Sequence, residues 1–124
     1  MAYSCWYLTE DQKDMLMRIF SPAYPDVIAH HVTCESGSRD SLEVPEPAKI
    51  EIIGFVDDGV GVQALIVTVN GNTERLNGGV YHITWSIDRA AGRTPKDSNT
   101  VISEKGWTPL VLTTSVETQP KIFS

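Results

Sequence analysis

Features that mark whole classes of protein are scarce in this chain of 124 residues. Its two cysteines, Cys5 and Cys34, form no closely spaced pair, so we expect neither a disulfide framework nor a zinc site. No apolar run approaches the ~18 residues that a membrane-spanning helix needs. No basic segment followed by a long apolar stretch opens the sequence, so no secretory signal is expected. We therefore expect a cytoplasmic protein that makes no membrane contact.

Positive charge is also in short supply. The chain has 10 Lys and Arg against 16 Asp and Glu, a formal net charge of −6. An acidic domain lacks the broad attraction that holds long nucleic acids, but a small phosphate-bearing ligand needs only local charge. Four basic residues lie close together in the sequence and could supply phosphate contacts, although each alone is typical of a solvated loop: Arg89, Arg93, Lys96 and Lys105.

Turn signals separate short apolar segments along the whole chain, which predicts a single α+β domain over residues 1–124. Thr9 precedes Glu10-Asp11-Gln12 in a capping-box pattern, and apolar residues follow at helical spacing until Pro22. This pattern predicts a helix over residues 10–20. We expect strands at 3–9, 27–35, 49–56, 62–69, 80–88 and 110–116, a shorter helix at 95–104, a long loop at 36–47 and turns at 57–59, 70–72 and 77–79.

A pattern of histidine, apolar residue, threonine and apolar residue occurs twice, as His31-Val32-Thr33-Cys34 and as His82-Ile83-Thr84-Trp85. Both copies fall on predicted strands, where alternate side chains point the same way. Each copy therefore places an imidazole beside a hydroxyl. If the two strands lie together, two imidazoles and two hydroxyls surround one small space. One imidazole as base, the other as acid, and hydroxyls on the phosphate oxygens suit metal-free phosphoryl transfer.

The same alternation sorts the neighbouring residues. Glu35 continues the face of the first copy and Ser86 continues that of the second, so both could extend a polar site. Cys34 and Trp85 point the other way and are expected in the core. His30 has no threonine two residues on, so we expect it to point away from the site and to have a structural or peripheral role.

Further candidates for ligand contact are aromatic or basic. Tyr3 and Tyr7 alternate with Trp6 along the first predicted strand, so the tyrosines could face the same groove and stack on bases. The alternative is that Trp6 packs on the helix and the tyrosines line the surface. Trp107 is a further stacking candidate, although an isolated tryptophan is more often a packing residue. Arg89, just after the second copy, is a candidate phosphate contact.

The paired motifs resemble the signature of the 2H phosphoesterase family, also called LigT-like, over roughly residues 27–88. The resemblance implies a compact, mostly antiparallel α+β fold with the two motifs on inner strands and one or two helices. It implies that His31 and His82 act as acid and base, that Thr33 and Thr84 hold the phosphate, and that no metal or cofactor is needed. Family members include RNA cyclic phosphodiesterases and compact phage-encoded enzymes that cleave the cyclic nucleotides of bacterial anti-phage signalling.

Several functions remain open from the sequence. The leading hypothesis is a metal-independent phosphodiesterase acting on cyclic nucleotides, in the host cytoplasm if the chain is phage-encoded. The alternatives are an enzyme that processes RNA ends with a 2′,3′-cyclic phosphate, a non-catalytic protein that sequesters a nucleotide, and a structural protein whose two histidines lie far apart. The expected partner is a small nucleotide rather than a long nucleic acid, and the sequence carries no signal of an oligomeric state.

Overall fold

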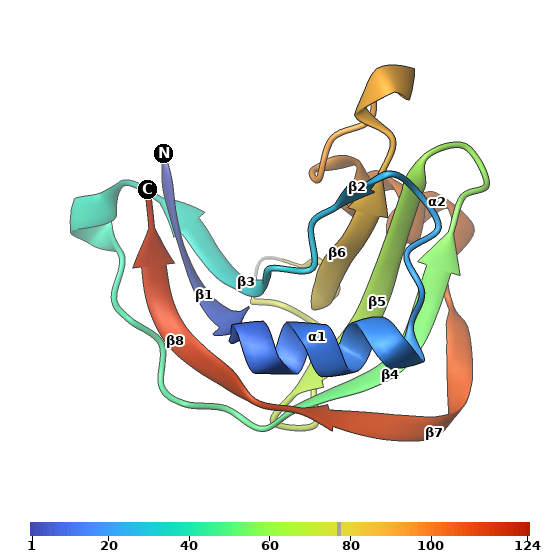
Figure 1. Ribbon diagram of the computed structural model, residues 1–124. Coiled ribbons are helices and arrows are strands. Elements are labelled where there is room, and N and C mark those ends of the chain that lie inside the picture. Colours follow the sequence, from blue (N-terminus) through green and yellow to red (C-terminus); the bar gives the residue numbers. More distant parts are fainter. Residues whose placement is uncertain (77) are drawn as a thin grey trace.

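Most of the secondary structure is β-strand. A computed structural model describes residues 1–76 and 78–124, so the turn predicted at 77–79 falls partly outside the described residues. Two short 3-10 turns, Arg39–Ser41 and Arg89–Ala91, lie between the helices and strands. The elements are β1 (Ala2–Leu8), α1 (Glu10–Ile19), β2 (Asp26–Val27), β3 (His31–Gly37), β4 (Ile50–Asp57), β5 (Val62–Val69), β6 (His82–Ile87), α2 (Asp97–Lys105), β7 (Thr108–Val116) and β8 (Thr118–Phe123) (Figure 1).

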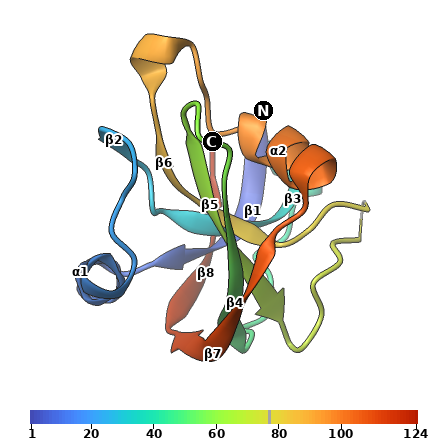
Figure 2. The same ribbon diagram turned by 90° about the vertical axis from the view of Figure 1, so that its right-hand side faces the viewer.

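All the strands belong to one antiparallel sheet, in the order β7-β4-β5-β6-β3-β1-β8, with β2 paired to β6. β7 and β8 lie at opposite ends of this order, yet only Glu117 separates them in the chain. The two ends of the sheet therefore come together, and the sheet curls around its core (Figure 1). The two helices lie on opposite sides of the strands (Figure 2). The predicted α+β class and mostly antiparallel sheet are confirmed.

Helix α1 forms where the capping pattern predicts it. The Thr9 side chain accepts a hydrogen bond from the backbone N–H of Gln12 at 3.4 Å, which satisfies one of the free amides of the first turn. Leu16 is fully buried against the sheet. The Gln12 side chain in turn accepts from the N–H of Glu117, so the helix is tied to the junction of β7 and β8.

Among the described residues, no helix is long and apolar enough to span a membrane.

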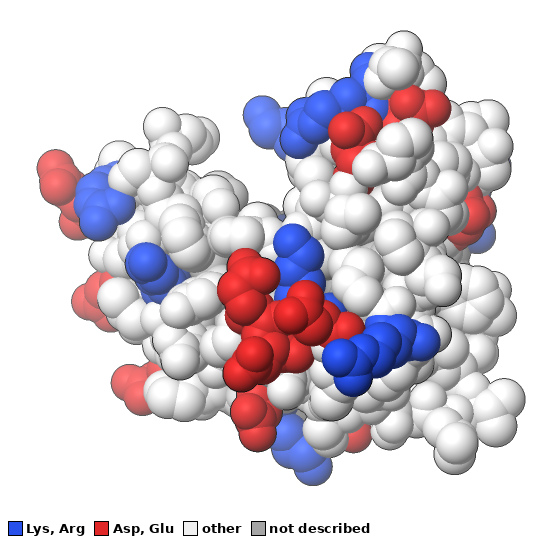
Figure 3. Space-filling view, viewed as in Figure 1, with Lys and Arg blue, Asp and Glu red and all other residues white. Residues whose placement is uncertain are grey.

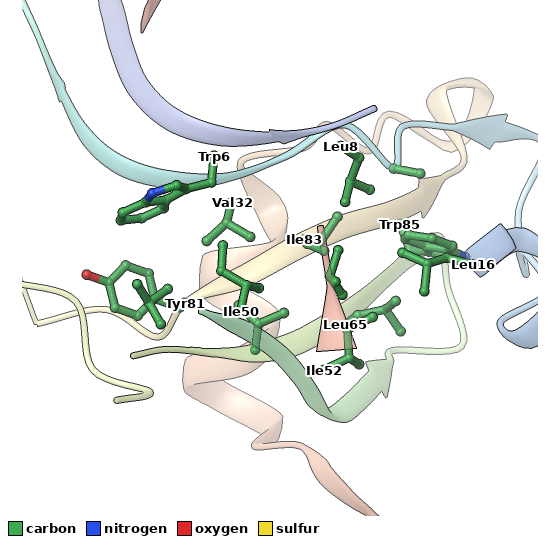
Figure 4. Close-up of a cluster of buried hydrophobic side chains, with 14 residues drawn as sticks. Trp6, Leu8, Leu16, Val32, Ile50, Ile52, Leu65, Tyr81, Ile83 and Trp85 are labelled. Carbon is green, nitrogen blue, oxygen red and sulfur yellow. The ribbon is translucent and has the colours of Figure 1, made fainter. Parts of the chain in front are cut away.

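Two clusters of buried side chains hold the sheet together. The larger contains Trp6, Leu16, Val32, Ile83 and Trp85 (Figure 4), and burying each large aliphatic side chain contributes about 1.5–3 kcal/mol. The polar atoms of its tryptophans are satisfied, because the two indole N–H groups donate to backbone carbonyls at 2.8 Å. The smaller cluster packs α2 against β4, β5 and β6. Trp85 is therefore a core residue, as its place on the strand predicts.

The expected strand at 27–35 is broken in two. Ala29 has a φ of 42°, a left-handed conformation that interrupts the extended chain. The N–H groups of Ile28 and Ala29 instead donate to the carbonyls of Trp85 and Thr84 on β6. The strand after the break starts at His31, so the side-chain alternation predicted for residue 30 does not hold.

β8 has no counterpart among the predicted strands. It pairs only with β1, at the edge of the sheet, and its Pro120 lies opposite Trp6. Proline lacks an N–H and is tolerated on an edge strand where that side faces away from the partner. A short segment that contains proline gives little strand signal by itself, and the pairing partner supplies the missing information.

Candidate active site

The two motif strands are neighbours in the sheet. β3 pairs antiparallel with β6 through Val32 and Ile83, and both of these side chains are fully buried (Figure 4). Because side chains alternate along a strand, the histidine and threonine that flank each buried residue point to the opposite face. The antiparallel pairing also turns each histidine towards the threonine of the other copy, which gives the site an approximate two-fold symmetry.

The side chains on that face line one cavity of about 250 Å³. His31, Thr33, His82 and Thr84 all line it. Viewed as in Figure 1, the surface is hollowed between the arm that carries β1 and β3 and the arm that carries β6, with acidic residues gathered over α1 outside the hollow (Figure 3). The four residues that the repeated pattern singles out therefore meet at one place.

The second copy is held rigidly. His82 Nδ1–H donates to the backbone carbonyl of Val80 at 2.7 Å, which leaves Nε2 as the unprotonated nitrogen of the neutral ring. Thr84 is buried, and its hydroxyl donates to the carbonyl of Pro95 at 3.3 Å. The fully buried hydroxyl of Ser98 on α2 lies 2.9 Å from the hydroxyl oxygen of Thr84. Helix α2 therefore fixes the position of the Thr84 hydroxyl at the cavity wall.

The first copy has different neighbours. His31 Nε2 lies 3.1 Å from the hydroxyl of Thr33, and its Nδ1 lies 2.9 Å from Nδ1 of His30. The ring stacks on Tyr3 with centroids 4.6 Å apart and an interplanar angle of 24°. An aromatic face on one side and a second imidazole on the other thus orient this histidine, where a backbone carbonyl orients His82.

Burial lowers the pKa of both site histidines, because a charged imidazole loses hydration inside the protein. Burial lowers the pKa of His31 to about 4, helped by the like charges of His30, His82 and Arg75. Burial also lowers the pKa of His82, against the opposing effect of its hydrogen bond to Val80. Both rings are therefore neutral at neutral pH in the ligand-free protein, and a bound anion would favour their protonation.

Both motif strands contain a β-bulge immediately after the threonine, and this corrects two sequence predictions. On β6, Thr84 pairs with Ala64 and Ser86 with Gln63, so one extra residue lies between them and Ser86 turns to the other face. The Ser86 hydroxyl is fully buried there and donates to the Gln63 side chain at 2.6 Å. The expectation that Ser86 extends the polar site is wrong.

The same shift occurs on β3. Thr33 pairs with Cys5 while Glu35 pairs with Ser4, so Glu35 also turns away from the face of the site and is exposed. Ser36, paired with Tyr3, takes its place at the cavity. The expectation that Glu35 shares a face with the first motif is therefore wrong, and for the same physical reason.

The remaining predicted contacts divide into one that reaches the cavity and three that do not. Tyr3 lines it and stacks on His31. Tyr7 shares that face, but its hydroxyl donates to Gln119 at 2.8 Å outside the cavity. Arg89 is exposed in the short turn that follows the end of β6, where its backbone N–H donates to Asp26. Trp107 packs over Gly54, where a side-chain carbon would overlap its ring, so it is a packing residue.

Arg75 is a cavity residue that the sequence analysis did not single out. It lies between β5 and β6, where its N–H donates to the carbonyl of Gly79 and its carbonyl accepts from Gly78. Its Nε is buried and has no hydrogen-bond partner among the described residues. A buried guanidinium nitrogen without a partner is costly, so a ligand that accepts from it would be favoured.

Two further residues that line the cavity, Lys96 and Asn99, come from the start of α2. The described residues that line the cavity include these two and Arg75 but no carboxylate. A second, shallower hollow adjoins the cavity and shares Ser36, Arg75, Lys96 and Asn99 with it. In a chain of net charge −6, this local excess of cations marks the region as suited to an anion. No local pattern marks Arg75, because it lies in the loop before β6, where no strand alternation predicts which way its side chain points.

Within the part of the chain that the structure describes, no three His, Cys, Asp or Glu side chains are grouped so that they could hold a metal ion. Comparison with protein-family models, with curated proteins and with solved structures found no match to this chain. The geometry of the cavity and the two motifs are therefore the features of this chain that bear on its function.

Proposed function

We propose that this protein is a metal-independent phosphodiesterase that hydrolyses cyclic nucleotides by two-histidine acid–base catalysis. The observation that carries the proposal is the meeting of both His-apolar-Thr motifs on neighbouring antiparallel strands, around one cavity. It is supported by the resemblance of these motifs to the 2H phosphoesterase signature. Two separate histidines with structural roles would have no reason to share a cavity lined by hydroxyls and cations.

The chemistry follows from the side chains. A phosphodiester needs a nucleophile that loses a proton and a leaving oxygen that gains one, and imidazole performs either task near neutral pH. Histidines from two strands can lie on opposite sides of the phosphorus, as in-line displacement requires. The hydroxyl of Thr33 and the guanidinium of Arg75 then donate to the non-bridging oxygens, where negative charge increases in the transition state. The hydroxyl of Thr84 does the same when it turns from the carbonyl of Pro95 to the phosphate.

The charge distribution supports a small ligand over a long one. The net charge of −6 repels an extended nucleic acid, while Arg75 and Lys96 attract a phosphate locally. The adjoining hollow gives room for the rest of a nucleotide beyond the reacting phosphate. From the resemblance to compact phage enzymes we further propose that the substrate is a signalling nucleotide of bacterial anti-phage defence, encountered in the host cytoplasm.

A substrate panel tests the function. Wild-type protein is mixed with cyclic dinucleotides, 3′,5′-cyclic mononucleotides and a short RNA with a 2′,3′-cyclic phosphate end, with and without a chelator, and products are separated by chromatography. We expect turnover of a cyclic nucleotide with chelator present. His31→Ala and His82→Ala should each lose ~10²–10⁴-fold, the contribution of one general acid or base. Trp107→Phe, outside the cavity, is the matched control.

Each other outcome contradicts a defined part of the proposal. Full activity in either histidine variant, or loss of wild-type activity with chelator, would reject the two-histidine mechanism. Preferred cleavage of the RNA end would replace the substrate class with RNA processing. Binding of a nucleotide without any product would show a sequestering protein instead of an enzyme.

A further inference from the structure

A third imidazole, that of His30, contacts the site through the ring of His31. The break at Ala29 ends the alternation expected for a continuous strand, and the His30 ring lies with its centroid 5.1 Å from that of His31. The two Nδ1 atoms are 2.9 Å apart. Contrary to the sequence expectation, His30 points towards the working histidine and not away from it.

A hydrogen bond between two Nδ1 atoms requires one proton between them, carried by either ring. If His31 carries it, Nε2 of the neutral His31 is a bare acceptor. If His30 carries it, neutral His31 holds its proton on Nε2, the nitrogen that lies 3.1 Å from Thr33. His82 has no such choice, because a carbonyl can only accept and therefore fixes the proton on Nδ1. The two site histidines are thus chemically different despite their matching motifs.

A positive charge is less disfavoured on His30 than on His31. Partial burial and the nearby Lys13 lower the pKa of His30, but its side chain is exposed, whereas burial lowers the pKa of His31 to about 4. A proton shared by the pair can therefore carry its charge on the solvated ring. The titratable or charged groups around the two rings come from α1, β1, β8, the loop before β6 and β6 itself: Glu10, Lys13, Tyr3, Tyr7, Lys121, Arg75 and His82.

We propose that His30 is a positioning residue that stores the proton which His31 delivers, so that His31 is the general acid and His82 the general base. This inference rests on the proposed phosphodiesterase function and assigns the two roles within it. His82, with Nδ1 tied to Val80, presents a bare Nε2 to the nucleophile. His31, with His30 donating to its Nδ1, presents an Nε2–H to the leaving oxygen.

The proton count balances over one turnover. Before reaction, with the anionic substrate bound and favouring protonation of the pair, His30 is protonated on both nitrogens and donates Nδ1–H to His31. As the nucleophile attacks phosphorus it gives its proton to His82 Nε2, and the bond from phosphorus to the leaving oxygen breaks. That oxygen takes the proton from His31 Nε2, while the bridging proton passes from His30 to His31. The pair ends neutral and His82 ends charged. After product leaves, His82 loses its proton to solvent, and the pair takes one back from solvent through His31 Nε2.

The free protein tests the proton arrangement without any substrate. Nitrogen-15 NMR of the three imidazoles, titrated between pH 4 and 8 with and without inorganic phosphate, reports which nitrogen carries each proton. We expect His82 to be in the Nδ1–H form and His30 and His31 to take up a single proton together, at higher pH when phosphate is present. Independent titration of His30 and His31, or a His82 proton on Nε2, would overturn the assignment even if the protein proves to have no phosphodiesterase activity.

Kinetics then separates proton storage from mere support. His30→Asn keeps a side chain that can hydrogen-bond His31 but cannot titrate, and His30→Leu removes the partner. We expect both variants to keep KM and to match wild-type kcat within about twofold near pH 4, where His31 alone still holds its proton. Their kcat should fall about tenfold per pH unit above a midpoint shifted to lower pH, since buried His31 alone holds its proton poorly. If His30→Asn restores the wild-type pH profile, His30 only supports the ring and the proposal fails, while the phosphodiesterase function stands.

Discussion

The two copies of the motif are alike in sequence and in backbone but differ in what lies behind them. Each has a buried aliphatic residue between histidine and threonine, and each is followed by a β-bulge. Behind the second copy lie groups that do not titrate, the carbonyl of Val80 and the hydroxyl of Ser98. Behind the first copy lie an aromatic face and another imidazole, those of Tyr3 and His30.

This difference shows how a repeated pattern can give two chemical roles. The pattern itself delivers an imidazole and a hydroxyl to one face of a strand. The partner of the second ring nitrogen then decides whether the imidazole is held in one tautomer or can exchange a proton. Each copy of the motif, with the groups behind it, forms one half of the site, and a substitution can either remove what the two halves share or act on one half alone.

Arg75 belongs to neither half, because it contacts the cavity from the loop before β6 and its charge lowers the pKa of both histidines. We expect Arg75→Ala to lower kcat by ~10²–10³-fold, as loss of one donor to a developing phosphate charge does. Arg75→Lys should recover part of this, because it keeps the charge but loses the planar fork of donors. Steady-state kinetics on the best substrate measures both.

Arg89→Ala is the matched control for Arg75, since it removes one positive charge from outside the cavity. Its kcat and KM should stay at wild-type values. An equal loss of kcat in the two alanine variants would mean that Arg75 acts only through the net charge of the protein. Its position at the cavity would then not matter for activity.

Substitutions of the two threonines are expected to differ in their effect on the free energy of unfolding. Thr33→Val and Thr84→Val should each lower kcat about 3- to 10-fold, the value of one neutral hydrogen bond. Only Thr84→Val should also lower the free energy of unfolding, by about 1–3 kcal/mol, because it leaves the buried Ser98 hydroxyl without its partner. Urea denaturation measures this difference. Thr84→Ser keeps the hydroxyl and should remain near wild-type stability, and equal stability losses at the two positions would contradict the comparison.

Acid stability gives another contrast. Burial holds the pKa of His31 at about 4 in the folded protein, below the value near 6.5 expected for an unfolded chain. The folded state therefore binds fewer protons between these limits, so stability is fully present above about pH 6.5 and falls as the pH decreases towards 4. His31→Gln should make this decline shallower, and His30→Gln, on an exposed ring, should change it less. Urea midpoints at pH 7.5, 5.5 and 4.5 test the order, and an equal effect of the two substitutions would contradict it.

Much of this site follows from local sequence, and the rest depends on contacts between distant segments. Strand alternation is sufficient to bury Val32 and Ile83 and to direct the two histidines to the opposite face, and the Thr9 cap is sufficient to begin α1. Arg75 reaches the cavity only because the sheet brings its loop there. The position of His30 depends on the left-handed Ala29, whose conformation is set by hydrogen bonds to β6.

The bulges are the feature that strict alternation fails to predict, because one extra residue reverses every later side chain on the strand. They also give the smallest expected effect. Glu35→Gln should leave kcat and KM within about twofold of wild type, since the carboxylate is exposed and turned away from the cavity. A surface substitution of this kind usually changes the free energy of unfolding by no more than about 0.5 kcal/mol.

The neighbouring position tests the same register from the other side. Ser36 faces the cavity next to Arg75, so Ser36→Leu should obstruct ligand access and raise KM, whereas Glu35→Leu should not. A regular strand would give the opposite pattern, with the effect at residue 35 and none at residue 36. The ratio of the two KM values therefore reports whether the bulge is present in solution. The same bulge at the second copy is what removes Ser86 from the cavity, so the result for β3 bears on both halves of the site.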